Sequence, residues 1–347
     1  MNRLKTLRRI ALLASGAVLS VTAITGCGNN ASGTNDGEKV VGYSQVSLSE
    51  PFQVTLSNLF LQNAKDIGLK TVENNANQDS QKQFSGIQSM IQAGAKGLVI
   101  NAVDAKSVVP AIGYANGRNI PVVAIDSAPA GGDVYMVIQA DNTDMAAKAC
   151  KALGEGIGGQ GEVLMINGSL KNSSGIQRQQ GFLNCMKQSF PNVTLYDEVA
   201  NWDPAKAASI AQTVLTAHPK IKAIYLATDT LYLTPVWSVL ERLGMAHPAG
   251  ESGHIFMASI DGSPTGLAGI RAGHLDVSIS QPLDRYAEFG AKYIQAALDG
   301  QKQEPGETDH GPVKEVDGLL VNFIPSDIVT KDNVEESTLW GNLAAKK

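Results

Sequence analysis

The sequence predicts an α/β fold in which parallel sheets are covered by helices on both faces. Short apolar runs alternate with longer segments from residue 40 almost to the end of the chain. The longer segments repeat apolar residues at spacings of three and four, which is the period of an amphipathic helix. The short runs are apolar throughout, as strands buried on both faces are. About 300 residues take part in this pattern, enough for two lobes with separate cores.

The elements follow one another in regular order. The expected strands are residues 40–43, 97–101, 121–126, 135–140, 162–167, 223–228, 256–261 and 275–280. The helical segments include residues 52–68, 81–95, 142–156, 176–187, 209–218 and 285–300. Gly68, Gly94 and either Gly117 or Asn119 lie just past helical segments, where a helix stop is expected. Residues 74–79 alternate oxygen-bearing side chains as a calcium loop does, but they lack its glycine and distal glutamate, which favours a loop with a helix cap.

The first 26 residues have the organisation of a secretory signal peptide. Four basic residues stand among the first nine, and the apolar stretch 10–24 is shorter than the roughly 20 residues of a membrane-spanning helix. Small residues then precede Cys27, which resembles the lipobox of bacterial lipoproteins, although Ile24 stands where leucine is commoner. The resemblance implies that Cys27 is lipidated and is the only membrane attachment. The alternatives are a plain cleavable signal and an uncleaved anchor. Residues 27–39 are small and polar, as a flexible tether is, and folded structure is expected from Val40.

Composition narrows the function classes. Hydrophobic residues make up 43% of the chain and the net charge is −5, which argues against disorder and against a nucleic-acid-binding surface. Besides Cys27, only Cys150 and Cys185 remain, an even pair in an exported chain. We expect them to form a disulfide between successive helices. The alternative is two separate buried thiols.

Polar side chains at strand ends form the candidate site. In doubly wound sheets, ligands bind beyond the carboxyl ends of the strands. The residues at these ends are Gln45, Ser47, Asn101, Asp126, Asn167, Thr228, Asp261 and Gln281. A single polar residue in such a place is often a helix cap or a turn former, and Asp126 or Asp261 taken alone has this alternative.

Eight motifs together resemble the bacterial periplasmic sugar-binding proteins of the ribose- and galactose-binding type. They are EPF at 50–52, IPVVAID at 120–126, ADN at 140–142, SSGIQRQQGF at 173–182, NWDPAKA at 201–207, TAHP at 216–219, ASIDGSPTG at 258–266 and ISQPLDRYAEFGAK at 279–292. Each motif alone is weak, but their order and spacing are specific. The resemblance covers nearly everything after Val40.

The resemblance implies two doubly wound lobes joined by a three-crossing hinge, with a sugar or sugar alcohol enclosed between them. Lobe 1 is expected at residues 40–139 and 282–309, and lobe 2 at residues 140–281 and 310–347. The tail at 318–342 is expected to pack on lobe 2. The implied function is solute binding for an ABC importer, with its membrane permease as partner. The protein would act as a monomer without cofactor or metal.

Site residues follow position by position from the same resemblance. Phe52 and Trp202 are implied to cover the two sides of the sugar, although packing is the alternative role for Trp202. Hydrogen-bonding groups are implied at Asp126, Arg178, Asp261, Gln281, Thr228, Asn172 and Ser174, and the candidate set also holds Glu50, Ser127 and Gln45. Glu50 stands where asparagine or aspartate is usual, Gln53 replaces a second aromatic, and Ser127 replaces an arginine. These departures argue against ribose itself.

Aromatic rings, carboxylates, amides and an arginine are the groups that a sugar needs, because its faces are apolar and its edge carries hydroxyls that both donate and accept. Three rival functions remain. For an enzyme, His218, His247, His254, His274 and His310 lack metal-ligand spacing, and the sequence has neither a GxSxG elbow nor a phosphate-binding loop. A transcriptional regulator would need an N-terminal helix-turn-helix where this chain has a signal peptide. A sensor that signals to a receptor stays open.

Overall fold

The computed structural model describes residues 39–344. The expected signal peptide and the lipidation site Cys27 lie outside the described residues. Within the described part, none of the helices is long and apolar enough to cross a bilayer.

Lobe 1 is built on a seven-stranded sheet in the order β11-β12-β5-β4-β3-β1-β2. Its strands are β1 (Val40–Gln45), β2 (Lys70–Asn75), β3 (Gly97–Ile100), β4 (Val122–Ile125), β5 (Met136–Gln139), β11 (Val313–Val316) and β12 (Leu319–Phe323). All neighbours pair in parallel except β11 and β12, which form an antiparallel hairpin at one edge.

Lobe 2 is built on a six-stranded sheet in the order β13-β10-β9-β8-β6-β7. Its strands are β6 (Gln160–Asn167), β7 (Asn192–Val199), β8 (Ile221–Leu226), β9 (Phe256–Asp261), β10 (Val277–Ser280) and β13 (Asp327–Val329). Only the edge strand β13 runs antiparallel to its neighbour. The predicted α/β class is therefore confirmed, with mixed sheets in which parallel pairing dominates.

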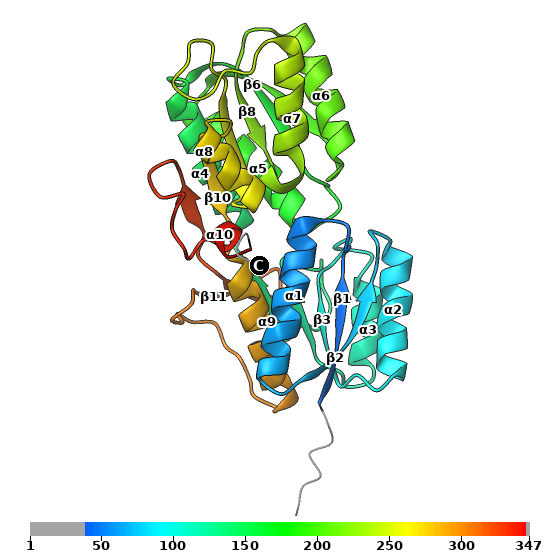
Figure 1. Cartoon of the computed structure of the whole chain (residues 1–347). Helices are drawn as coiled ribbons and strands as arrows, with labels where there is room; N and C mark the ends of the chain where they lie inside the picture. Colours follow the sequence, from blue (N-terminus) through cyan, green and yellow to red (C-terminus); the bar gives the residue numbers. More distant parts are fainter. Residues whose placement is uncertain (1–38, 345–347) are drawn as a thin grey trace, which may run out of the picture. The chain divides into compact units, whose positions relative to one another are not determined.

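Helices cover both faces of each sheet (Figure 1). The helices are α1 (Pro51–Asp66), α2 (Ser80–Gln92), α3 (Val109–Asn116), α4 (Asn142–Gly156), α5 (Ser173–Ser189), α6 (Pro204–Ala217), α7 (Asp229–Leu243), α8 (Pro264–Ala272), α9 (Leu283–Leu298) and α10 (Trp340–Ala344). In lobe 1, α1 packs with α9, and α2 with α3. In lobe 2, α4 packs with α5, and α6, α7 and α8 form a second layer. One hydrophobic cluster runs through both lobes and joins α1 and α9 to α4 and α5.

Local sequence explains where the helices begin. Side chains at the N-cap accept backbone N–H groups that would otherwise lack partners, as Asp79 does for α2, Asp141 for α4 and Asp203 for α6. The loop and cap predicted near residues 74–79 are thus present, although β2 extends as far as Asn75. The strands β2 and β7 are absent from the sequence-based set because half-exposed edge strands lack a continuous apolar run.

The assignment of residues 310–347 to lobe 2 is wrong for the hairpin of β11 and β12. This hairpin belongs to lobe 1, because β12 pairs in parallel with β5 from Val321 to Phe323. Only β13 and α10 of the tail lie on lobe 2, where β13 pairs with β10 and α10 packs on α8. The third crossing therefore lies between Phe323 and Asp327 instead of near residue 310.

The three crossings are held together by hydrogen bonds. The Tyr286 hydroxyl accepts from the backbone N–H of Ala140 at 2.7 Å and donates to Gln281 Oε1 at 3.2 Å, which joins the first crossing to the second. The backbone N–H of Ile324 in the third crossing donates to the carbonyl of Gln139 at 2.9 Å. Hydrogen bonds thus connect all three segments that cross between the lobes.

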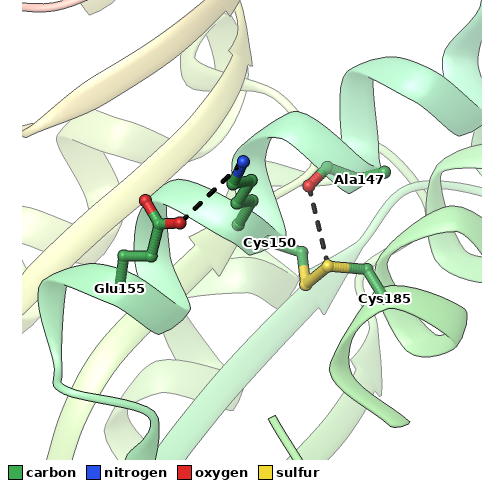
Figure 2. Close-up of a disulfide and its surroundings, with 5 residues drawn as sticks. Ala147, Cys150, Glu155 and Cys185 are labelled. Atoms are coloured by element: carbon green, nitrogen blue, oxygen red, sulfur yellow. Dashed lines mark hydrogen bonds and ion pairs between the residues drawn. A yellow bond between two sulfur atoms is a disulfide. The ribbon is translucent and has the colours of Figure 1, made fainter. Parts of the chain in front are cut away.

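A disulfide joins Cys150 of α4 to Cys185 of α5, the pair expected from the sequence. Figure 2 shows the two side chains pointing toward each other between the neighbouring helices. The Cys150 side chain is fully buried in the hydrophobic cluster that both lobes share. The bond therefore ties together the two helices on one face of lobe 2.

We predict that reduction under denaturing conditions raises the number of reactive thiols by two. Because the bond spans 35 residues, the free energy of unfolding of a Cys150→Ser/Cys185→Ser variant should be roughly 2 to 4 kcal/mol lower than that of the wild type. Thiol counting before and after reduction, together with urea unfolding, checks both statements. An unchanged thiol count would contradict the disulfide.

Candidate ligand-binding site

A cavity of about 290 Å³ lies at the carboxyl ends of the strands of both sheets. Eleven of the twelve residues proposed from the sequence line it: Glu50, Phe52, Asp126, Ser127, Asn172, Ser174, Arg178, Trp202, Thr228, Asp261 and Gln281. Gln45 does not. Its side chain is turned sideways onto the neighbouring strand β2, where Nε2 donates to Glu73 Oε2 at 2.8 Å.

Asp261 is the most heavily bonded group of the lining. Its Oδ2 accepts from the hydroxyls of Thr228 at 2.5 Å and Thr230 at 2.8 Å. Its Oδ1 accepts from Gln281 Nε2 at 2.7 Å and lies 3.4 Å from Arg178 Nη1. The side chain is only 3% exposed, so these donors replace the water that a buried carboxylate loses.

The turn after Asp261 is fixed from below by Asp229 at the start of α7. The Asp229 carboxylate accepts from the backbone N–H groups of Gly262 and Ser263, both at 3.1 Å. Position 262 requires glycine, since φ is +68° and a Cβ would lie 2.4 Å from Ser280 Oγ. Burial, together with the negative charge of Asp261, raises the pKa of Asp229 above its usual range.

Arg178 reaches the cavity from α5 and is 3% exposed. Its Nε donates to Asn142 Oδ1 at 2.9 Å, and its Nη1 donates to the carbonyl of Ala227 at 2.7 Å. The guanidinium is therefore held in place by neutral acceptors as well as by Asp261. Such a fixed arginine is preorganised to donate to a ligand oxygen.

Trp202 lies in the loop between β7 and α6, with its backbone in the left-handed region at φ +61°. Its backbone N–H donates to the Tyr232 hydroxyl at 2.8 Å, and Arg178 Cζ lies 5.8 Å from its ring centroid. The ring packs directly over Gly168, where a Cβ would come within 2.0 Å of it. The absence of a side chain at residue 168 thus creates the place that the ring occupies.

Lobe 1 presents Asp126 at the end of β4. Its Oδ2 accepts from Asn101 Nδ2 at 2.9 Å and from Gln53 Nε2 at 3.4 Å. Burial raises the pKa of the Asp126 carboxyl, against the opposing influence of these bonds and of the Arg178 charge. Asn101 Oδ1 is a buried acceptor that has no hydrogen-bond partner within the described residues. Lobe 1 therefore contributes the Asp126 carboxyl group and the Asn101 amide to the cavity lining.

Glu50 is the N-cap residue of α1, but its side chain makes no capping hydrogen bond. Its side chain lines the cavity instead, and Oε1 accepts from Gln78 Nε2 at 2.5 Å. Burial and the negative charges of Asp126 and Asp261 raise the pKa of Glu50 to about 7. The cavity thus holds a third carboxyl group that keeps its proton more readily than an exposed glutamate.

Some lining residues also have structural partners. Asn172 caps α5, since its Oδ1 accepts from the backbone N–H of Gly175 at 3.0 Å. The lobes touch beside Ser127, where Ser173 Oγ accepts from the backbone N–H of Ala128 at 2.8 Å and lies 3.3 Å from Ser127 Oγ. The backbone N–H of Ala105 donates to the carbonyl of Lys171 at 3.0 Å, which makes a second contact between the lobes.

Most of the non-glycine residues with a strained, positive-φ backbone lie at this cavity. Eight non-glycine residues in the described part of the chain have positive φ. Five of them line the cavity: Gln78, Asp126, Asn201, Trp202 and Asp261. Such conformations cost about 1 to 3 kcal/mol each and cluster at functional sites. Their concentration here marks the cavity independently of its side-chain chemistry.

Sequence reasoning missed part of the lining. The proposed set lacks Val46, Gln53, Gln78, Asn101, Ala102, Val103, Ser169, Lys171, Asn201, Thr230 and Leu231. Asn101 is absent from the set carried over from the resemblance, but it is one of the strand-end residues predicted above, of which Ser47 and Asn167 do not line the cavity. Gln53 and Thr230 lie in the first turns of α1 and α7. Every helix that starts at this edge of a sheet has such a first turn, so this position alone does not identify them as lining residues. Gln78 comes from a loop and carries no recognisable signal.

We predict that Glu50 makes folding stability depend on pH. The folded chain keeps this proton up to about pH 7, whereas an unfolded glutamate releases it near 4.5. Stability from this group is therefore fully present below pH 4.5 and is lost as the pH rises to about 7. The glutamine in Glu50→Gln does not titrate, so the variant does not lose this stability. Its melting temperature relative to that of the wild type should therefore rise by a few degrees between pH 4.5 and about pH 7. Melting of both proteins at several pH values, with exposed Glu241→Gln as control, checks this. A difference that is independent of pH would contradict it.

Comparison with known proteins agrees with this architecture. Residues 41–302 match the family model described as a periplasmic binding protein domain. The chain is 27% identical over 304 residues to the ribose import binding protein of Bacillus subtilis (strain 168), which covers 85% of this chain and 95% of that protein. It is 27% identical over 287 residues to the D-allose-binding periplasmic protein of Escherichia coli (strain K12), covering 79% and 89%.

Among solved structures, an ABC transporter solute binding protein from Bacillus halodurans C-125 with bound myo-inositol has a TM-score of 0.76. It is 20% identical in sequence, and the match covers 88% of this chain and 99% of that one. This likeness concerns the two-lobed fold alone. The family match over most of the folded part shows that the chain belongs to the family of periplasmic binding proteins.

Proposed function

We propose that the chain is an extracytoplasmic solute-binding lipoprotein that captures a monosaccharide or sugar alcohol and presents it to the permease of an ABC importer. The observation that carries the proposal is the mixed lining of the cavity. Aromatic rings at Phe52 and Trp202 suit the apolar faces of such a molecule, and Asp126, Arg178 and Asp261 suit its hydroxyl edge. The relatives named for ribose and D-allose support the same ligand class.

The size of the cavity favours a single small ring or a short polyol. Its volume of about 290 Å³ lies just below the roughly 300 to 1,000 Å³ typical of ligand pockets. An oligosaccharide would need more space. With groups from both lobes in contact with it, the ligand gains its full set of bonds only when the lobes are together, so closure follows from differential affinity.

Charge narrows the ligand further. The lining carries Glu50, Asp126 and Asp261 against Lys171 and Arg178. Arg178 is already engaged by Asp261, and Lys171 is exposed. An anionic ligand would meet three carboxyl groups and one buried cation, Arg178, whose charge Asp261 already balances, which is costly in a site shielded from water. We therefore expect neutral polyols to bind in preference to sugar acids and sugar phosphates.

The proposal includes export, anchoring through Cys27, action as a monomer without cofactor, and binding without catalysis. Support for export comes from the basic and apolar N-terminal segment and from the family. Support for binding alone comes from the family and from Asp261, which hydrogen bonds from Thr228, Thr230 and Gln281 hold in a fixed orientation at the cavity.

We predict that a thermal-shift panel of neutral sugars and polyols finds a stabilising ligand, whereas sugar acids and sugar phosphates do not stabilise. A ligand at a hundred times its dissociation constant should add about 2.7 kcal/mol, and it should be recovered chemically unchanged. The panel should include D-ribose, D-allose, xylitol and myo-inositol with gluconate and ribose 5-phosphate.

Asp261→Asn should weaken binding of the best neutral ligand roughly ten- to hundredfold by calorimetry, while exposed Asp66→Asn should not. Stabilisation by the acids alone would refute the proposed ligand class.

We predict that Cys27→Ala abolishes lipid labelling. The variant should be released from the membrane or keep its signal peptide, because the acceptor sulfur is gone. Metabolic labelling with a fatty-acid analogue, followed by membrane fractionation, measures both effects, and Cys150→Ser/Cys185→Ser serves as the control. Continued labelling of the Cys27→Ala chain would overturn the anchor assignment.

A further inference from the structure

The C-terminal segment after β13 returns to the back of the ligand cavity, where Trp340 contacts two of the lining residues. This side chain is buried at 3% exposure. Its Nε1 donates to the main-chain carbonyl of Asp261 at 2.7 Å. Its ring packs edge to face with the ring of Phe52, at a centroid distance of 5.8 Å and an interplanar angle of 89°. Trp340 therefore contacts one lining residue from each lobe.

The segment is fastened to lobe 2. Arg271 of α8 donates from Nε to Glu335 Oε1 at 2.7 Å, and from Nη2 to Asn342 Oδ1 at 2.7 Å and the carbonyl of Val334 at 3.2 Å. Gly341 lies so close to the turn after Asp261 that a Cβ would come within 2.5 Å of the Gly262 carbonyl oxygen. Trp340 is thus carried by lobe 2, and Phe52 by lobe 1.

The Asp261 carbonyl needs this support. Asp261 has φ +128°, a conformation that a residue with a side chain adopts only when its surroundings hold it. Two donors reach its carbonyl, the Trp340 indole N–H and the backbone N–H of Gln281 at 2.9 Å. The direction of the carboxylate toward the cavity depends on the same backbone, so a change in carbonyl direction would also move the carboxylate.

We propose that Trp340 is a positioning residue for the binding site and a latch between the lobes. Its indole N–H sets the orientation of Asp261, and its ring receives Phe52 when the lobes are together. The C-terminal segment then controls ligand affinity without touching the ligand, since Trp340 is not part of the cavity lining. This inference deepens the proposed function and rests on it for its second role.

The two roles separate experimentally. Trp340→Phe keeps a ring beside Phe52 but removes the N–H donor, whereas Trp340→Ala removes both. Trp237→Phe is the matched control, because Trp237 is also buried in lobe 2 but stacks on His274 away from the cavity. A merely structural Trp340 would lower the melting temperature of the ligand-free protein and leave the affinity of the folded protein unchanged.

The first measurement needs no ligand. Hydrogen exchange of the Gln281 amide, which donates to the same carbonyl, should become faster in Trp340→Phe and stay unchanged in Trp237→Phe. An unchanged Gln281 amide in Trp340→Phe would overturn the positioning role. This outcome is independent of whether the proposed function is correct.

The second measurement is calorimetric titration with D-ribose, D-allose, xylitol and myo-inositol. For each probe that binds the wild type, Trp340→Phe should weaken affinity roughly five- to tenfold, and Trp340→Ala should weaken it further. Equal affinity in Trp340→Phe and wild type would refute the positioning role, and equal affinity in the two variants would refute the latch. If no probe binds the wild type, the ligand class is wrong and the latch falls with it, while hydrogen exchange still decides the positioning role.

Discussion

The arrangement depends most on the Asp261 carboxylate. It is buried at the end of β9 and draws donors from three other elements: Arg178 on α5, Thr230 on α7 and Gln281 in the second crossing. A buried carboxylate without such partners would be expensive. All three donors therefore bind the Asp261 carboxylate. Their hydrogen bonds hold α5, α7 and the second crossing next to the end of β9. Much of the lobe 2 side of the cavity is organised around one charge.

The hinge is a second constraint, and it arises from topology. Each sheet is completed by strands that arrive only after the chain has visited the other lobe. Tyr286 joins the first two crossings, and the hydrophobic cluster shared by the lobes passes beneath them. Neither lobe completes its sheet without the returning chain. The proposed closure would therefore turn about these three short segments.

Much of this could be predicted from the sequence, and the failures have physical causes. Buried strands and amphipathic helices have clear periods, and the rule that ligands bind at carboxyl ends located Asp126 and Asp261. The same rule failed for Gln45, because its amide found a partner on the neighbouring strand. The hairpin of β11 and β12 was misplaced because the sequence of a strand has no feature that indicates which sheet edge it joins. Trp340 could not be found, since its role depends on a return of the chain that no local pattern encodes.

The contact between Gly168 and Trp202 has a consequence for how this binding site changes over evolution. The ring occupies volume that exists only while residue 168 has no side chain. Residues 168 and 202 lie on different segments, yet residue 168 cannot gain a side chain while the ring of Trp202 stays where it is. A homologue with alanine or a larger residue at the first position must carry its ring elsewhere or have none. We therefore expect a side chain gained at residue 168 to be accompanied by a substitution at residue 202. A change of ligand preference that begins with residue 168 would then involve both residues.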